Sequence, residues 1–150
     1  MTHTVASKTT IAILYSGGDA PAMNMHLRCT VRIGLNRHEA VVLGVKGGYA
    51  GLVRTCQRLQ RGHINLDELK HEINEFPGRS GLARRTSDLV SMDHAAVQGL
   101  APRGGIILGA ARCQAFRDLY VRKQVVDLLD SLGVTTVMRG DRGHCMLLAG

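Results

Sequence analysis

Short, mostly apolar runs alternate along this chain with longer runs in which apolar residues are spaced as on one face of a helix. The short runs lie at residues 11–15, 40–45 and 134–138. Each is rich in aliphatic residues and bounded by turn residues, which is typical of strands buried on both faces. We therefore predict strands at these positions. The segment 104–109, bracketed by glycines, is expected to be a short strand or a turn.

Two of the longer runs have the apolar spacing of an amphipathic helix. One is residues 22–36, and the other is residues 114–132, where Gly133 is placed to end the helix. The apolar stripes consist of Met23, Leu27, Val31 and Leu35 in the first helix and of Val121, Val125, Leu128 and Leu132 in the second. Shorter helices are expected at 66–75, at 88–98 and from residue 144 to residue 149.

Strands that alternate with helices predict an α/β fold. We expect a Rossmann-like, three-layer sandwich with a mostly parallel sheet and helices on both faces. Right-handed crossovers would bring the loops after the strands to the same carboxyl edge of the sheet. These loops contain glycine, including the pairs Gly17-Gly18 and Gly47-Gly48. Three glycine-bearing loops should therefore converge where α/β proteins bind their ligands.

Composition narrows the class of partner. The 150 residues correspond to one domain, and 19 Lys and Arg against 12 Asp and Glu give a formal net charge of +7. This charge suits an anionic partner such as a nucleotide, a sugar phosphate or nucleic acid. The basic residues are scattered, and aromatic residues make up only 3% of the chain. A basic nucleic-acid-binding domain therefore ranks low among the alternatives.

The cysteines and the apolar runs also limit the class of protein. The four cysteines are far apart and form no C-x-x-C pair, so neither a zinc site nor a redox motif is indicated. No apolar run is long enough to span a bilayer. We expect free thiols and a soluble, cytoplasmic protein without a membrane partner.

The stretch from Ser16 to Asn24 reads SGGDAPAMN and joins the first strand to the first helix. Paired glycines at such a turn let the backbone approach a ligand closely, and the helix amino terminus favours an anionic group such as phosphate. The loop lacks the G-x-G-x-x-G pattern of NAD-binding domains. Asp19 also comes one position early for the S-G-G-x-D-S loop of pyrophosphatase-loop ATPases.

Four segments together resemble the 6-phosphofructokinase family. They are IAILYSGGDAPAMNMHLRCTVR (11–32), GVKGGYAGL (44–52), RGGIILGAARCQAFR (103–117) and LGVTTVMRGDRG (132–143). The resemblance implies that residues 11–150 form part of a phosphofructokinase-like nucleotide-binding lobe. The segment 54–102 would then be divergent and insert-like. Residues 1–10 are mostly polar, and we expect them to form a flexible amino terminus.

The resemblance implies transfer of the γ-phosphoryl group of Mg-ATP to the 1-hydroxyl of fructose 6-phosphate, a reaction of glycolysis. Carried over position by position, Gly18 would lie beside the nucleotide phosphates and Arg112 near the transferring phosphoryl group. Cys113 and Gly140 would border the nucleotide site. Asp141 would match the aspartate that holds Mg²⁺. The alternative interpretation is that Arg112 is an ordinary surface arginine and that Asp141 is an ordinary turn aspartate.

Arg28 and Arg32 would match two arginines that bind phosphorylated effectors at a subunit interface in allosteric bacterial members of the family. They lie four positions apart, on one face of the first predicted helix. A solvated helix face is the alternative interpretation, and it is the one that the sequence alone favours.

The sequence departs from the family at its Gly-Gly-Asp-Gly-Ser block, which here reads Arg139-Gly140-Asp141-Arg142-Gly143. Members that use ATP have glycine after the aspartate and members that use diphosphate have aspartate, so Arg142 matches neither donor class.

The family's catalytic base lies in a Thr-Ile-Asp-Asn-Asp-like segment, which comes after these motifs together with the sugar-phosphate lobe. We therefore assign no catalytic residue, and a catalytically inactive nucleotide- or partner-binding module stays open beside the kinase. A partial lobe would also leave apolar surface uncovered, so we expect self-association.

Overall fold

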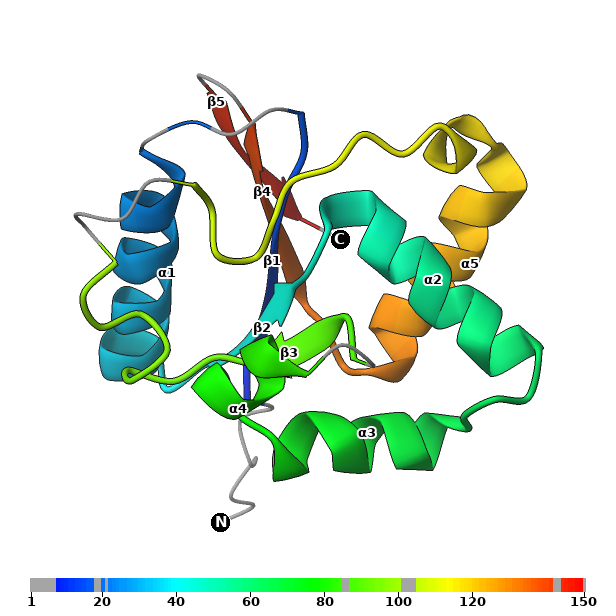
Figure 1. The fold of residues 1–150 in the computed structure, drawn as a ribbon, viewed down its shortest axis with the longest axis horizontal. Coiled ribbons are helices and arrows are strands. Elements are labelled where there is room, and N and C mark those ends of the chain that lie inside the picture. Colours follow the sequence, from blue (N-terminus) through cyan, green and yellow to red (C-terminus); the bar gives the residue numbers. More distant parts are fainter. Residues whose placement is uncertain are drawn as a thin grey trace, which may run out of the picture.

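The computed structural model describes residues 8–17, 20, 22–84, 87–100 and 105–141, and the backbone of 144–149. Its strands are β1 (Thr10–Tyr15), β2 (Val41–Val45), β3 (Leu89–Ser91), β4 (Thr136–Asp141) and β5 (His144–Ala149). Its helices are α1 (Met23–His38), α2 (Gly48–Gln60), α3 (Leu66–Glu75), α4 (Gly78–Ala83) and α5 (Leu119–Ser131), with a short 3-10 helix at Ala115–Arg117. Within the described residues, the strands form one sheet between layers of helices (Figure 1).

The sheet has the order β3-β2-β1-β4-β5. Strand β1 lies at its centre and pairs in parallel with β2 on one side and β4 on the other. The outer strands β3 and β5 run antiparallel to their neighbours. The α/β sandwich expected from the sequence is therefore confirmed, with a parallel centre and an antiparallel strand at each edge.

Helix α1 covers one face of the sheet, and α2 and α5 cover the other (Figure 1). Side chains of β1 alternate between these layers. Ile13 and Tyr15 pack in the core under α1 with Leu27 and Val31, and Leu14 packs in the core under α2 and α5. Each of these side chains is fully buried. Side chains of a strand point to the same face at every second residue, and those of a helix at about every fourth. This spacing decides which side chains of β1 and α1 pack together.

Both predicted apolar stripes face the core. Met23, Leu27, Val31, Val125 and Leu128 are buried, and Leu35, Val121, Leu132 are partly buried against them. The second helix is shorter than expected, because residues 115–117 form a 3-10 turn. Helix α5 then begins after Asp118, whose side chain accepts a hydrogen bond from the Tyr120 N–H at 2.8 Å. It ends at the positive φ of Gly133, as predicted.

The helix expected at 88–98 is wrong: this segment forms β3 followed by turns. Pairing with the edge of β2 outweighs the local helical spacing. The Met92 N–H donates to the Val42 carbonyl at 2.7 Å, extending the ladder. Leu89 and Val90 are buried in cores on opposite faces of the sheet, as successive residues of a strand must be.

The helix expected to begin at residue 144 is also wrong, because 144–149 form β5. The strand pairs antiparallel with β4, from Asp141 opposite His144 to Thr136 opposite Ala149. A run of six residues gains little as an isolated helix, whereas pairing satisfies the backbone groups along the edge of β4.

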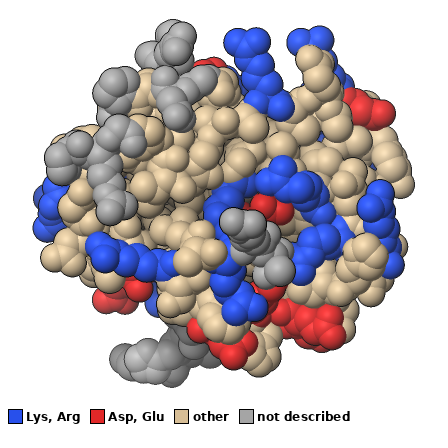
Figure 2. Space-filling model, in the orientation of Figure 1, with Lys and Arg blue, Asp and Glu red and all other residues tan. Residues whose placement is uncertain are grey.

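The segment 54–102 packs into the same domain as the motifs around it. Leu69 and Ile73 of α3 are buried in the core under α2 and α5. Ion pairs join Arg54 to Asp88 at 3.0 Å and Arg58 to Glu72 at 3.7 Å. On the face drawn in Figure 2, Lys and Arg side chains gather around a smaller acidic group near the middle. Both apolar burial and ion pairs therefore hold the helices and strand of this segment in place.

Candidate functional site

The segments after β1 and β2 lie with the end of β4 at the carboxyl edge of the sheet, as expected for two of the three glycine-bearing loops; the third, after β4, lies outside the described residues. The Ser16 N–H donates to the Gly140 carbonyl at 3.0 Å, which joins the first loop to β4. The Gly47 N–H donates to the Leu108 carbonyl at 2.8 Å, which joins the second loop to the segment 105–113. One continuous surface therefore combines parts of the chain that lie far apart in sequence.

Helix α2 begins on this surface, and glycine is what lets it approach so closely. A Cβ at Gly48 would lie 2.2 Å from the carbonyl oxygen of Tyr15 and 3.4 Å from that of Ala111. Gly47 and Gly48 also have φ values of 73° and 60°, which disfavour any larger residue. The free N–H groups and positive dipole end of α2 thus lie beside the end of β1.

Asp141, the last residue of β4, lies against the loop that follows β1. A Cβ at Gly17 would be 2.6 Å from its Oδ1 atom, so only glycine fits there. Its Oδ2 atom accepts a hydrogen bond from Arg139 Nη2 at 2.7 Å. Residues 139 and 141 are two apart on a strand and therefore share a face of the sheet. The pair is about two-thirds buried, with 30% of Arg139 and 33% of Asp141 exposed.

The Arg139 guanidinium places a permanent positive charge in this site. Burial disfavours that charge, but hydrogen bonds to Asp141 and to Tyr49 outweigh it and raise the pKa of Arg139 above its ordinary value. Tyr49 in turn stacks on Phe116, with ring centroids 4.0 Å apart. The buried Nε atom of Arg139 has no hydrogen-bond partner among the described residues. This donor is buried as well as unpaired, so it stays unsatisfied within the described part of the chain.

Other residues expected in the nucleotide site are placed as follows. Gly18 lies outside the described residues, as does Arg142. Arg112 is exposed on the segment that approaches α2, and Cys113 is partly buried against the core under that helix. Gly140 is buried, and a Cβ there would lie 2.4 Å from the ring of Tyr15. Gly140 is thus required by packing alone.

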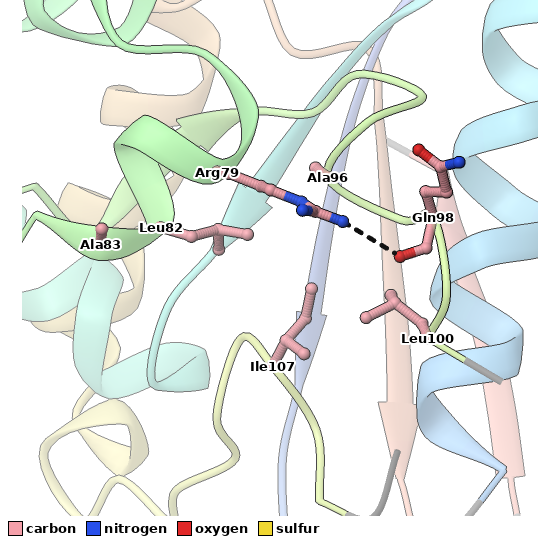
Figure 3. Close-up of a pocket in the computed structure, with 7 residues that line it drawn as sticks. All are labelled: Arg79, Leu82, Ala83, Ala96, Gln98, Leu100 and Ile107. Carbon is pink, nitrogen blue, oxygen red and sulfur yellow. Dashed lines mark hydrogen bonds between the residues drawn. The ribbon is translucent and has the colours of Figure 1, made fainter. Parts of the chain in front are cut away.

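Arg28 and Arg32 lie on α1, which covers the opposite face of the sheet from α2. With His94, Ala95, Val97 and Gln98 they line a groove of about 510 Å³. A smaller cavity of about 330 Å³ lies nearby (Figure 3). There Arg79 donates to the carbonyls of Ala95 and Gln98 at 3.1 and 3.4 Å. The two arginines therefore share one groove, separate from the surface around Asp141.

Asn24 is a site residue that the sequence reasoning missed. It is 2% exposed, its side-chain amide donates to the Gly105 carbonyl, and its side-chain oxygen accepts from the Ile107 N–H at 3.1 Å. Asn24 thus ties the SGGDAP-x-MN motif to the GG-x-x-LG block. The sequence did carry a signal for this role, because Asn24 directly follows Met23, the first residue of an apolar helical stripe. A polar side chain that is buried at such a position needs hydrogen-bond partners.

The carboxylate of Asp141, as it stands, does not fit a metal ion. One oxygen is paired with Arg139 and the other faces Gly17. A magnesium ion needs free carboxylate or phosphate oxygens. The described residues also contain no group of three His, Cys, Asp or Glu side chains that could hold a metal. The cation beside Asp141 in this structure is Arg139.

Comparison with known proteins identifies the architecture. Residues 10–142 match the sequence model of a family described as Phosphofructokinase. The ATP-dependent 6-phosphofructokinase of Clostridium botulinum is 33% identical over 128 residues, which are 85% of this chain and 30% of that protein. ATP-dependent 6-phosphofructokinase 1 of Clostridium perfringens has the same identity and coverage. The chain thus spans about a third of the length of these relatives.

Solved structures agree with the sequence relatives. The crystal structure of Pichia pastoris phosphofructokinase in the T-state superposes with a TM-score of 0.64 and 28% identity, over 90% of this chain and 11% of that one. The phosphofructokinase of Saccharomyces cerevisiae superposes with a TM-score of 0.62 and 29% identity, over 88% and 14%. Among the described residues, no helix is long and apolar enough to cross a membrane.

Proposed function

The chain belongs to the phosphofructokinase family, and we propose that it forms part of a nucleotide-binding lobe for phosphoryl transfer from ATP to the 1-hydroxyl of fructose 6-phosphate. The names of the relatives, ATP-dependent 6-phosphofructokinases, support the donor and the reaction class. The observation that carries the proposal is the meeting of the β1 loop, the start of α2 and the end of β4 at one edge. A glycolytic role in the cytoplasm belongs to the same proposal.

The proposed site binds the polyphosphate of the nucleotide with backbone N–H groups and arginine. Phosphoryl transfer asks a protein mainly for positioning and for neutralisation of charge. The start of α2 and the Gly17-Gly18 turn would offer N–H groups, and Arg112 would reach the transferring phosphoryl group. Cys113 and Gly140 would border the nucleotide. The family resemblance implies magnesium as the companion of ATP, but Asp141 could ligate a metal only if its ion pair with Arg139 opened.

A catalytically inactive module that binds a nucleotide or a partner is the second candidate. The ion pair between Arg139 and Asp141 favours it, because it occupies the carboxylate that the family resemblance assigns to the metal. The groove that holds Arg28 and Arg32 would bind a phosphorylated effector in either case. Large apolar side chains exposed on α1 and α5 support self-association; these are Met25, Ile33, Leu119, Tyr120 and Val126.

Three measurements on the purified chain separate these candidates. Calorimetry with ATP and ADP tests nucleotide binding, and a coupled assay with ATP and fructose 6-phosphate tests turnover. Binding with turnover supports the kinase, whereas binding without turnover supports the inactive module. Absence of binding contradicts the kinase and the nucleotide-binding form of the inactive module. Sedimentation at micromolar concentration tests self-association, which a clean monomer would contradict.

A further inference from the structure

Arg139 is a described residue that distinguishes this site from the family pattern. Glycine stands at this position in the family's Gly-Gly-Asp-Gly-Ser block, and glycine offers no charge. Here the guanidinium lies at the carboxyl end of β4, in register with Leu14 of β1, and contacts Asp141 at 2.7 Å. It therefore adds a positive charge at the sheet edge where ligands of α/β proteins bind.

The surroundings of Arg139 match those of a group that binds a phosphate. Only 30% of the side chain is exposed, so water weakens its electrostatic interactions less than at an open surface. A guanidinium has five N–H donors in a planar fork that suits phosphate oxygens. The start of α2 lies nearby, because Tyr49 in its first turn contacts the guanidinium.

A guanidinium beside a carboxylate can perform the electrostatic task of a metal ion. A metal held by Asp141 would link that carboxylate to the phosphates and neutralise negative charge. Arg139 already pairs with Asp141 and can donate to a phosphate with its other N–H groups. A metal at Asp141 would also have to displace it. The Arg139 guanidinium and a metal ion at Asp141 therefore exclude each other in this site.

We propose that Arg139 takes the place of the metal ion, bridging Asp141 and the phosphates of a nucleoside di- or triphosphate, so that this chain binds such nucleotides without magnesium. The inference rests on the proposed function, since it presumes that the nucleotide lies at this edge of the sheet. It assigns the role to a residue that the sequence reasoning did not select.

The test is calorimetric binding of ADP to the 150-residue chain, once in EDTA and once in excess magnesium. We expect the affinity in EDTA to equal or exceed that in magnesium. Arg139→Gln should weaken binding in EDTA about tenfold or more, the usual effect of losing a charge-assisted bond to phosphate. Arg37→Gln, at an exposed position near the end of α1, is the matched control and should leave the affinity unchanged.

Asp141→Asn distinguishes phosphate binding by Arg139 from magnesium binding by Asp141, because it leaves the guanidinium unchanged. Under the proposal this variant keeps or gains affinity in EDTA, because Arg139 loses an anion that competes with phosphate. If Asp141 instead holds magnesium, the variant loses the affinity that depends on magnesium. Circular dichroism and thermal melts show whether each variant folds. Should Arg139→Gln fail to fold, the EDTA comparison and Asp141→Asn still decide the question.

The possible failures are distinguishable. No ADP binding in either buffer removes the proposed nucleotide site and this inference together. Binding only in magnesium, or binding in EDTA that Arg139→Gln leaves unchanged, overturns the inference and leaves the proposed function standing.

Discussion

The side-chain oxygen of Asn24 accepts a hydrogen bond from the Ile107 N–H at 3.1 Å, across 83 positions of sequence. The amide of the same side chain donates to the Gly105 carbonyl. One buried residue at the start of α1 thus satisfies the backbone of a loop that would otherwise leave polar groups unpaired. This pair of contacts holds two glycine-bearing motifs together at the candidate site.

Replacing Asn24 by alanine should lower the free energy of unfolding by about 2 kcal/mol. The Ile107 N–H and the Gly105 carbonyl would lose their partner in a site where Asn24 is only 2% exposed. Urea denaturation measures the change. Asn36→Ala, at an exposed position on the same helix, is the control and should stay within about 0.5 kcal/mol of the parent. Equal effects of the two substitutions would contradict a structural role for Asn24.

The elements predicted well from sequence are those that local patterning decides. The apolar run at 11–15 became β1, and residues 66–75 form α3, whose start is fixed by a capping box between Asn65 and Glu68. The segments 88–98 and 144–149 were predicted wrongly, because their structure depends on pairing with β2 and β4. Long-range strand pairing overrode a weak helical spacing in both.

Gly48→Ala should destabilise the chain by at least about 2 kcal/mol. The added Cβ would lie 2.2 Å from the Tyr15 carbonyl oxygen, and a φ of 60° already disfavours alanine by about 1 kcal/mol. Gly62→Ala is a matched control, because Gly62 has a φ of 71° and no atom within 4 Å of an added Cβ. Urea denaturation gives the loss of unfolding free energy for each variant. The amount by which the loss for Gly48→Ala exceeds that for Gly62→Ala is the cost of the steric clash. No excess would mean that α2 can move away from β1.

The candidate site was predictable only in outline. The convergence of the loops after β1 and β2 follows from the alternation of strands and helices, which a sequence reveals, and from the right-handedness of their connections. Contacts of single side chains do not follow from it: Arg139 was noted only as part of a divergent block, although its ion pair decides what Asp141 can bind. The second neighbour of this carboxylate, Gly17, comes from another strand end and reaches Asp141 only in the assembled sheet.

Stability should fall as the pH drops through the range below about 6.5. Burial lowers the pKa of His26 from its ordinary 6.5, and the Tyr15 hydroxyl lies 2.9 Å from its Nδ1 atom. The unfolded chain then binds a proton at a higher pH than the folded chain does. The contribution of His26 to stability is complete above its pKa in the unfolded chain. It is lost as the pH falls toward its lower pKa in the folded chain.

Thermal melts between about pH 7.5 and 5.5 test this dependence. His26→Gln should flatten the decline, whereas His71→Gln, at an exposed position on α3, should keep it. A decline that is equally steep in all three proteins would rule out His26 as its source.

The ion pair between Arg54 and Asp88 should couple α2 to β3 by about 0.5–1 kcal/mol. Two contacts join the side chains, at 3.0 and 3.2 Å, and Asp88 is only 15% exposed although Arg54 is 52% exposed. A double-mutant cycle of Arg54→Gln and Asp88→Asn, followed by urea denaturation, measures the coupling. It should shrink in about 1 M salt, because Arg54 lies partly in solvent. The Arg58–Glu72 pair, at 3.7 Å, serves as the comparison and should couple more weakly. If the Arg54 cycle gives no coupling at low salt, apolar packing and the backbone pairing of β3 with β2 hold these elements together without the ion pair.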